Sequence, residues 1–245
     1  VYDGWYTADD FVEGSYNSAG NTWTLKEDVV QNSTAVARPG YIKFKNMTEG
    51  DKVIDSDDMT VIGNTAPKHF GGFNTSFRYK SFDLTAAFNW SYGNDIYNAT
   101  KIQLYDGTPK ETNLSADFAN AYTLLDDSGN IITSLSELNT RNAKATMYSP
   151  YLGSPILHSG LIEDGSFLRL NNLTIGYTFP QKWTKVIGLN KARLYVTGTN
   201  LFCITSYSGY DPEVDAYSSN ALTPGVDSWG YPKTRSYVFG VNLTF

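Results

Sequence analysis

The sequence predicts an all-β protein whose antiparallel strands belong to a large transmembrane β-barrel with long extracellular loops. First, residues 235–245 alternate between apolar and polar side chains, which is typical of a strand with one apolar face. Second, 18 Tyr, 13 Phe and 5 Trp make up 15% of the 245 residues and accompany 21 glycines, as in β-proteins with aromatic girdles. Third, long and short connections alternate between the strands of the second half, whereas a soluble sandwich usually has short turns at both ends.

Composition excludes several other classes of protein. No stretch approaches 18 consecutive apolar residues, so a transmembrane helix is not expected. The net charge of −6 argues against a nucleic-acid partner, and the single cysteine, Cys203, cannot form an internal disulfide. The chain opens at Val1 without a charged, apolar leader, which predicts a processed or truncated piece of a longer protein.

The first half of the chain contains one strong hairpin. Residues 1–39 predict at most one strand, residues 41–45 a short strand, and residues 46–64 an acidic loop. Residues 73–79 and 82–92 then alternate strictly around a two-residue connection, Lys80-Ser81, which is typical of a periplasmic turn.

The second half alternates strands with loops. The polar stretch 93–165 is expected to be an extracellular loop, and a strand over 166–179 ends at Pro180. The connector 181–190 has room for one helical turn, a strand over 191–200 returns, and the stretch 201–233 forms a second long loop before the terminal strand.

The direction of the apolar side chains separates two hypotheses. In a barrel the apolar face points to lipid and the polar face to a wet lumen, whereas in a soluble extracellular carbohydrate-binding β-sandwich the same apolar face would form the core. The residues that decide this are Phe82, Leu84, Phe88, Tyr237, Phe239 and Val241.

An ordered series of sequence blocks carries a resemblance to a known family. The blocks are "RPGYIKFKN", "EGDKVIDSDDMTVIGN", "PKHFGGFNTSFRYKSFDLTAAF", "SFLRLNNLTIGYTFP", "ARLYVTGTNLF", "YSGYDPEV" and "YPKTRSYVFGVNLTF". Together they resemble the C-terminal end of a SusC/RagA-type TonB-dependent transporter of the Bacteroidetes outer membrane, from about Arg38 onward. Any one block alone is weak, but their order is highly specific.

The resemblance implies a barrel of about 22 strands with an N-terminal plug and a TonB box. Such a transporter imports oligosaccharides or oligopeptides across the bacterial outer membrane, with a SusD-like surface lipoprotein as its lid. Residues 1–245 offer only about six or seven strands at the usual strand length, so they are expected to be the C-terminal part of such a barrel, with plug and TonB box absent. An open arc leaves unpaired edges in lipid. The expected partners are therefore the rest of the barrel and plug, the lipoprotein, outer-membrane lipid, and TonB through the missing N-terminal part.

The acidic loop resembles a degenerate calcium loop of that family. Aligned on "VID", it offers Glu49, Asp51, Asp55 and Asp58 as oxygen ligands, and these four would hold Ca²⁺. Met47 occupies the first ligand position, and Lys52 occupies the position of the turn glycine, where its ammonium could replace the cation. The alternative is a solvated acidic loop with local Asx turns. No other cofactor is expected.

The last long loop is the candidate for ligand capture or lid docking. Its rings could stack on sugar or peptide faces beside carboxylates that accept hydrogen bonds. The residues are Tyr207, Tyr210, Tyr217, Trp229 and Tyr231, with Asp211, Glu213 and Asp215 between them. The alternative is that the rings pack the loop or sit in the interfacial belt.

Nothing in the sequence predicts an enzyme. His69 and His158 lie far apart, are expected on the surface or in loops, and lack partners at the spacing of a triad or zinc site. The pairs Asp57-Asp58 and Asp126-Asp127 are expected to be exposed loop charges, not glycosidase acids. Phe245 resembles the terminal aromatic that the barrel-assembly machinery reads.

Overall fold

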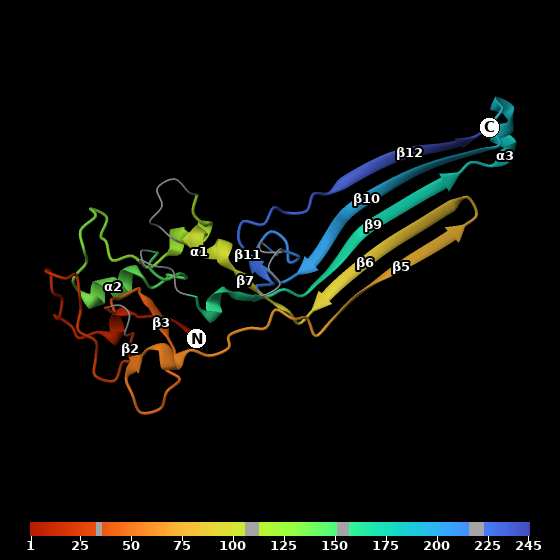
Figure 1. Ribbon diagram of the computed structural model, residues 1–245. Helices are drawn as coiled ribbons and strands as arrows, with labels where there is room; N and C mark the ends of the chain where they lie inside the picture. Colours follow the sequence, from red (N-terminus) through yellow and green to blue (C-terminus); the bar gives the residue numbers. More distant parts are fainter. Residues whose placement is uncertain (33–35, 106–112, 151–156, 216–222) are drawn as a thin grey trace. The chain divides into compact units, whose positions relative to one another are not determined.

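The computed structural model describes residues 1–32, 36–105, 113–150, 157–215 and 223–245 (Figure 1). The chain folds as two compact units. Unit 1 comprises Val1–Gly63 and Ala99–Ile162, and unit 2 comprises Asn64–Asn98 and Glu163–Phe245. Each unit is therefore built from two stretches that are separate in the sequence.

A five-stranded antiparallel sheet forms most of unit 2, in the order β12-β10-β9-β6-β5 (Figure 1). Its strands are β5 (His69–Tyr79), β6 (Phe82–Tyr92), β9 (Phe167–Thr178), β10 (Lys191–Thr205) and β12 (Ser236–Thr244). The predicted hairpin is confirmed, with Lys80 in the left-handed region at φ 53°. β10 runs to Thr205, so the prediction that this strand ends at residue 200 was wrong.

The register of this sheet separates the side chains into an apolar and a polar face. Residues opposite each other on neighbouring strands point to the same side. One row across all five strands is apolar: Phe77, Leu84, Ile175, Val196 and Phe239. The adjacent row is mostly polar: Ser76, Thr85, Thr174, Thr197 and Val238. The predicted set, Phe82, Leu84, Phe88, Tyr237, Phe239 and Val241, does share the apolar face.

Short helical segments connect β9 to β10. α3 (Gln181–Thr184) follows Pro180, and η5 (Lys185–Ile187) follows α3 directly. Gly188 ends the turn at φ 77°, a conformation that glycine adopts without strain. The single helical turn expected here is confirmed.

Residues 93–165 contain more regular structure than the sequence predicts. They hold β7 (Asp95–Asn98), α1 (Ala99–Tyr105), η3 (Ala116–Asn120), α2 (Leu135–Arg141), η4 (Ser159–Leu161) and β8 (Ile162–Asp164). A small sheet in the order β11-β7-β8 joins β7 to β11 (Val226–Asp227) in parallel. Elements of this length carry too little periodic pattern to be recognised from the sequence.

Unit 1 is held by aromatic packing more than by strands. β1 (Tyr2–Trp5) pairs with β3 (Ile42–Phe44), and β2 (Gln31–Asn32) pairs with β4 (Val53–Ile54). Its first segment also holds two single-turn elements: η1 (Ala8–Asp10) and η2 (Ser56–Asp58). Residues 1–39 thus hold two short strands, so the prediction of at most one was wrong.

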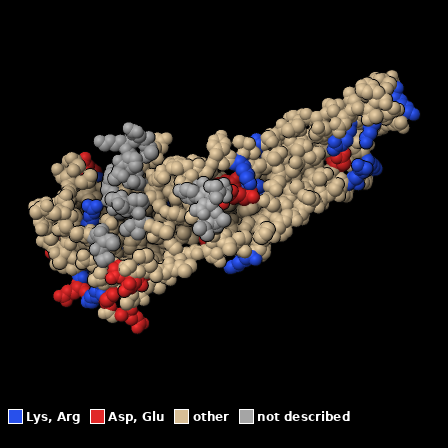
Figure 2. Space-filling view, viewed as in Figure 1, with Lys and Arg blue, Asp and Glu red and all other residues tan. Residues whose placement is uncertain are grey.

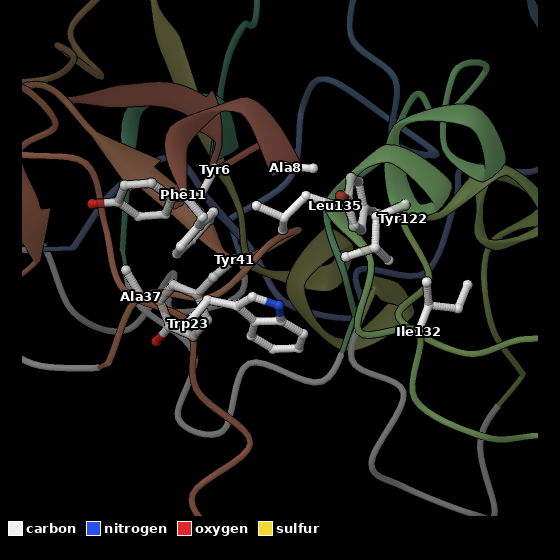
Figure 3. Packing of buried hydrophobic residues seen from close by; sticks show 10 residues of the cluster. Tyr6, Ala8, Phe11, Trp23, Ala37, Tyr41, Tyr122, Ile132 and Leu135 are labelled. Carbon is white, nitrogen blue, oxygen red and sulfur yellow. The ribbon is translucent and has the colours of Figure 1, made fainter. Parts of the chain in front are cut away.

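The core of unit 1 is drawn from both of its sequence segments (Figure 3). Tyr6, Phe11 and Leu138 are essentially inaccessible to solvent. They pack in one cluster with Trp23, Tyr41, Tyr122, Ile132 and Leu135. Rings of this size bury enough apolar surface to fold a unit with little regular structure.

In the part of the chain that the structure describes, no helix is both long enough and apolar enough to cross a membrane.

Candidate functional site

A buried arginine organises the segment that follows β10. Arg169 lies on the polar face of β9, and its side chain is 3% exposed. Its Nη2 donates to Asp211 Oδ1 at 2.6 Å, and its Nε lies 2.7 Å from Glu213 Oε2. That second contact is an ion pair without hydrogen-bond alignment at Nε. Because buried charges are costly unless paired, this cluster fixes where the loop leaves the sheet.

A bulge in β10 supplies a further partner. The register with β9 shifts between Thr199 and Phe202, and Asn200 there adopts φ 54°. The Asn200 side-chain oxygen accepts from Arg169 Nη1 at 2.5 Å, and its Nδ2 donates to the Lys233 carbonyl at 3.1 Å. The bulge therefore turns Asn200 so that it links the arginine to the segment leading into β12.

Tyr207 is fixed in the same loop. It is 6% exposed, and its hydroxyl donates to Asp227 Oδ2 at 2.6 Å. Burial, followed by the hydrogen bond to Asp227, raises the pKa of Tyr207. Ser208 beside it donates from its N–H and hydroxyl to Glu163, each at 2.9 Å.

The predicted loop residues thus fall into two groups. Tyr207, Asp211 and Glu213 are engaged in internal contacts. Three other aromatic residues are exposed to solvent: Tyr210 (72% exposed), Trp229 (51%) and Tyr231 (87%). Asp215 is among the described residues, whereas Tyr217 lies outside them.

Arg169 and Asn200 are not recognisable as site residues from the sequence pattern alone. An arginine at a polar-face position of "SFLRLNNL", followed downstream by the acidic "YDPEV", was the available signal. This signal is weak because Arg169 and the acidic segment are far apart in the sequence, and only the folded structure shows that the loop returns to the sheet.

In the acidic loop the carboxylates bind backbone N–H groups of the loop itself. Asp58 accepts from the N–H groups of Met47 at 2.6 Å, Thr48 at 3.0 Å and Asp55 at 2.9 Å. These hydrogen bonds lower the pKa of Asp58. The Asp55 carboxylate accepts a 2.8 Å hydrogen bond from the Asp57 N–H. This is an Asx turn, as expected for a solvated acidic loop that binds no calcium.

Two expectations about this loop were wrong. Lys52 does not lie among the carboxylates, since its ammonium donates to the Glu27 carbonyl at 2.6 Å. Asp58 was expected to be an exposed loop charge. It is only 4% exposed, because the loop closes over its carboxylate. Among the described residues no cluster of His, Cys, Asp and Glu is arranged to hold a metal ion.

The two histidines have different surroundings. His69 starts β5 and stacks on Tyr92 with ring centroids 4.9 Å apart. His158 lies in a loop, as predicted, but it is 5% exposed and stacks on Tyr2 at 5.0 Å. Burial, aided by the charge of Lys101, lowers the pKa of His158 to about 4.

A cavity of about 320 Å³ lies beside His158 within unit 1. Aromatic rings and two opposite charges line it: Tyr2, Tyr105, Tyr148, Lys101 and Asp117. Asp117 accepts a 2.6 Å hydrogen bond from the Tyr105 hydroxyl.

Comparison with known proteins gives a consistent set of relatives. No protein-family model matches the chain. The TonB-dependent receptor P3 of Formosa agariphila is 30% identical over 248 residues, covering 100% of this chain and 21% of that protein. The TonB-dependent receptor SusC of Bacteroides thetaiotaomicron is 26% identical over 201 residues, covering 80% of this chain and 17% of SusC.

Comparison of the fold with solved structures finds proteins of the same kind. A solved structure of the RagAB peptide transporter superposes with a TM-score of 0.60 at 26% identity, covering 80% of this chain and 19% of that one. The chain spans about a fifth of the length of the curated relatives it matches. These relatives are receptors and transporters and not enzymes, in agreement with the sequence prediction for this chain. Sequence and fold together identify the chain as a homologue of the SusC/RagA-type TonB-dependent receptors.

Proposed function

We propose that the chain forms part of the barrel of an outer-membrane TonB-dependent transporter. The observation that carries this is the apolar face of the five-stranded sheet, which lies open to solvent in the isolated chain. Phe77 is 63% exposed, Phe239 80% and Val241 59%. A contiguous apolar surface of this kind needs a cover, and lipid covers the outside of a barrel.

The polar face supports the same assignment. Thr174 and Thr197 share a 2.8 Å hydrogen bond between their hydroxyls, and Arg193 pairs with Asp83 across β9. Such a face suits a wet lumen. In the rival hypothesis, a soluble carbohydrate-binding sandwich, the apolar face would pack against a second sheet.

The transported class is oligosaccharides or oligopeptides, taken up with a SusD-like surface lipoprotein and driven by TonB. Support comes from the relatives, since one is named SusC and another is described as a peptide transporter. Exposed Tyr210, Trp229 and Tyr231 are the residues that we propose to meet the cargo or the lipoprotein. Phe245, which is 83% exposed, is proposed as an assembly signal.

The test is extraction and uptake with the intact receptor that contains this chain. We expect the receptor to remain in the outer-membrane fraction after salt and alkaline washes and to require detergent for release. Cells that lack the receptor should lose uptake of one cargo class, labelled oligosaccharides or labelled peptides. Release as a soluble monomer without detergent would overturn the proposal in favour of the sandwich.

A further inference from the structure

The turn between β9 and β10 presents unpartnered apolar side chains. In α3 and η5, Trp183 is 55% exposed, Val186 83% and Ile187 71%. The turn itself is well fixed: Trp183 N donates to the Pro180 carbonyl at 2.9 Å, and Leu189 N donates to the Thr184 carbonyl at 3.0 Å. Exposure of three large apolar residues on a rigid turn calls for a covering surface.

This apolar cluster follows directly along the chain from the end of the sheet's apolar face. The face ends here in an aromatic group in which the Phe82 and Tyr177 rings lie 4.8 Å apart and the Tyr177 and Phe179 rings 5.2 Å apart. Pro180 follows Phe179, and α3 starts directly after it. Aromatic side chains at the edge of an apolar band are typical of the boundary between hydrocarbon and headgroups.

Positive charge accompanies the cluster. Residues 176–195 contain Lys182, Lys185, Lys191 and Arg193 but no Asp or Glu. Figure 2 shows Lys and Arg side chains gathered at this end of the sheet, where Figure 1 labels α3. Arg193 is used internally on Asp83, whereas Lys182 and Lys185 are exposed and form no ion pair with the described carboxylates.

We propose that Trp183, Val186, Ile187, Lys182 and Lys185 form an interfacial anchor that binds anionic phospholipid. The apolar side chains enter the boundary region and the two ammonium groups lie at the phosphates, as in amphipathic interfacial segments. This inference rests on the proposed barrel, whose apolar face it extends. The occupant is a lipid leaflet because the patch joins apolar surface and uncompensated positive charge, a combination that matches phospholipid in both respects.

The anchor is tested by site-specific quenching in the intact receptor. A fluorescent label is attached at Val186→Cys in a cysteine-free background that includes Cys203→Ser, and the receptor is reconstituted in phosphatidylcholine vesicles with or without phosphatidylglycerol. Lipids that carry a quencher near the headgroup should quench this label, and more strongly when phosphatidylglycerol is present. The variant Lys182→Gln/Lys185→Gln should lower the affinity for phosphatidylglycerol by about fivefold per lysine.

Matched controls separate this inference from the proposed barrel. A label at Phe239→Cys, measured with lipids that carry the quencher on the acyl chain, reports the apolar face, and a label at Val61→Cys reports the exposed acidic loop. The variant Lys26→Gln/Lys144→Gln removes the same charge from exposed positions elsewhere and should not change lipid affinity.

Each remaining outcome counts against one of the two proposals. Quenching at position 239 but not at 186 means that the turn does not lie in the lipid, and it overturns the anchor while the barrel stands. Equal quenching at 186 with and without phosphatidylglycerol overturns the headgroup recognition. Absence of quenching at both 186 and 239 overturns the barrel itself.

Discussion

Arg193 on β10 binds Asp83 on β6 although a whole strand, β9, lies between them. The Arg193 Nε lies 3.0 Å from Asp83 Oδ1, and Nη2 also donates to the carboxylate. Gly176 makes this possible, because a Cβ there would lie 2.3 Å from Arg193 Nη2 and 2.6 Å from Asp83 Oδ1. Because Gly176 has no side chain, it leaves space on the polar face for the Arg193 guanidinium to reach Asp83.

We expect Gly176→Ala to displace this ion pair and destabilise the sheet. The pair is charge-assisted, with both side chains 20% exposed, so its loss should cost about 1–2 kcal/mol. The apparent melting temperature of the intact receptor in detergent measures the effect. In the Asp83→Asn background the same alanine should cost much less, since the two changes remove one interaction. Equal costs in both backgrounds would show that crowding by the added methyl group, and not the loss of the ion pair, is responsible.

We expect Arg169→Met to release the loop that follows β10. The substitution leaves the Asp211 carboxylate, 6% exposed, without its guanidinium, and breaking a buried pair costs about 3–5 kcal/mol. Limited proteolysis should then cut near residues 206–215, and the melting temperature should fall. Lys233→Met is the matched control, because that lysine is 47% exposed and an exposed pair is worth only about 0–1 kcal/mol. Similar losses in both variants would contradict the central role of Arg169.

How far the sequence predicts this molecule depends on the length of each element. The strands of the large sheet were predicted because eleven alternating residues, as in β6, fix both the element and its face. β2 and β4, of two residues each, follow from tertiary packing and leave no periodic signal. The same limit applies to the site: the aromatic residues of the last loop were identified from composition, but contacts such as Arg169 with Asp211, 42 positions apart, depend on the path of the chain.

We expect unit 1 to lose stability between about pH 6.5 and pH 4. The pKa of His158 is lowered to about 4 in the folded protein, whereas an unfolded histidine titrates near 6.5. In this window the unfolded chain binds a proton that the folded chain does not, so the free energy of unfolding falls with pH by up to about 3 kcal/mol. Hydrogen exchange of the backbone amides of unit 1, measured at several pH values and corrected for the intrinsic exchange rate, would measure this.

His158→Phe supplies the control for this pH dependence. It keeps a ring against Tyr2 but removes the titrating group, so stability between pH 6.5 and pH 4 should become nearly flat. Carboxylates with lowered pKa values, such as Asp58 and Asp126, titrate below their ordinary value of 3.8 and therefore act at lower pH. An unchanged slope in His158→Phe would assign the effect to another group.

We expect calcium to leave the acidic loop unaffected. The carboxylate of Asp58 already accepts three backbone N–H groups, and Asp51 accepts a 2.7 Å hydrogen bond from Asn46 Nδ2. Even weak extracellular calcium sites bind at about 0.1–1 mM, so a titration to several millimolar with a melting readout is sufficient. A rise in melting temperature that a chelator reverses, and that Asp58→Asn abolishes, would instead support the calcium loop.

The exposed and buried tyrosines of the last loop should respond differently to substitution. Tyr231 is 87% exposed and Tyr207 6% exposed, so only the former has surface to offer a cargo or a lipoprotein. Tyr231→Ala should therefore weaken capture of the purified lipoprotein, by about 2 kcal/mol if the ring lies at the centre of the interface, without changing the melting temperature. Tyr207→Phe removes the hydrogen bond to Asp227 and should lower the melting temperature while the exposed rings stay intact. Binding that is insensitive to alanine at Tyr210, Trp229 and Tyr231 together would exclude these rings as the contact surface and leave the interfacial belt as their role.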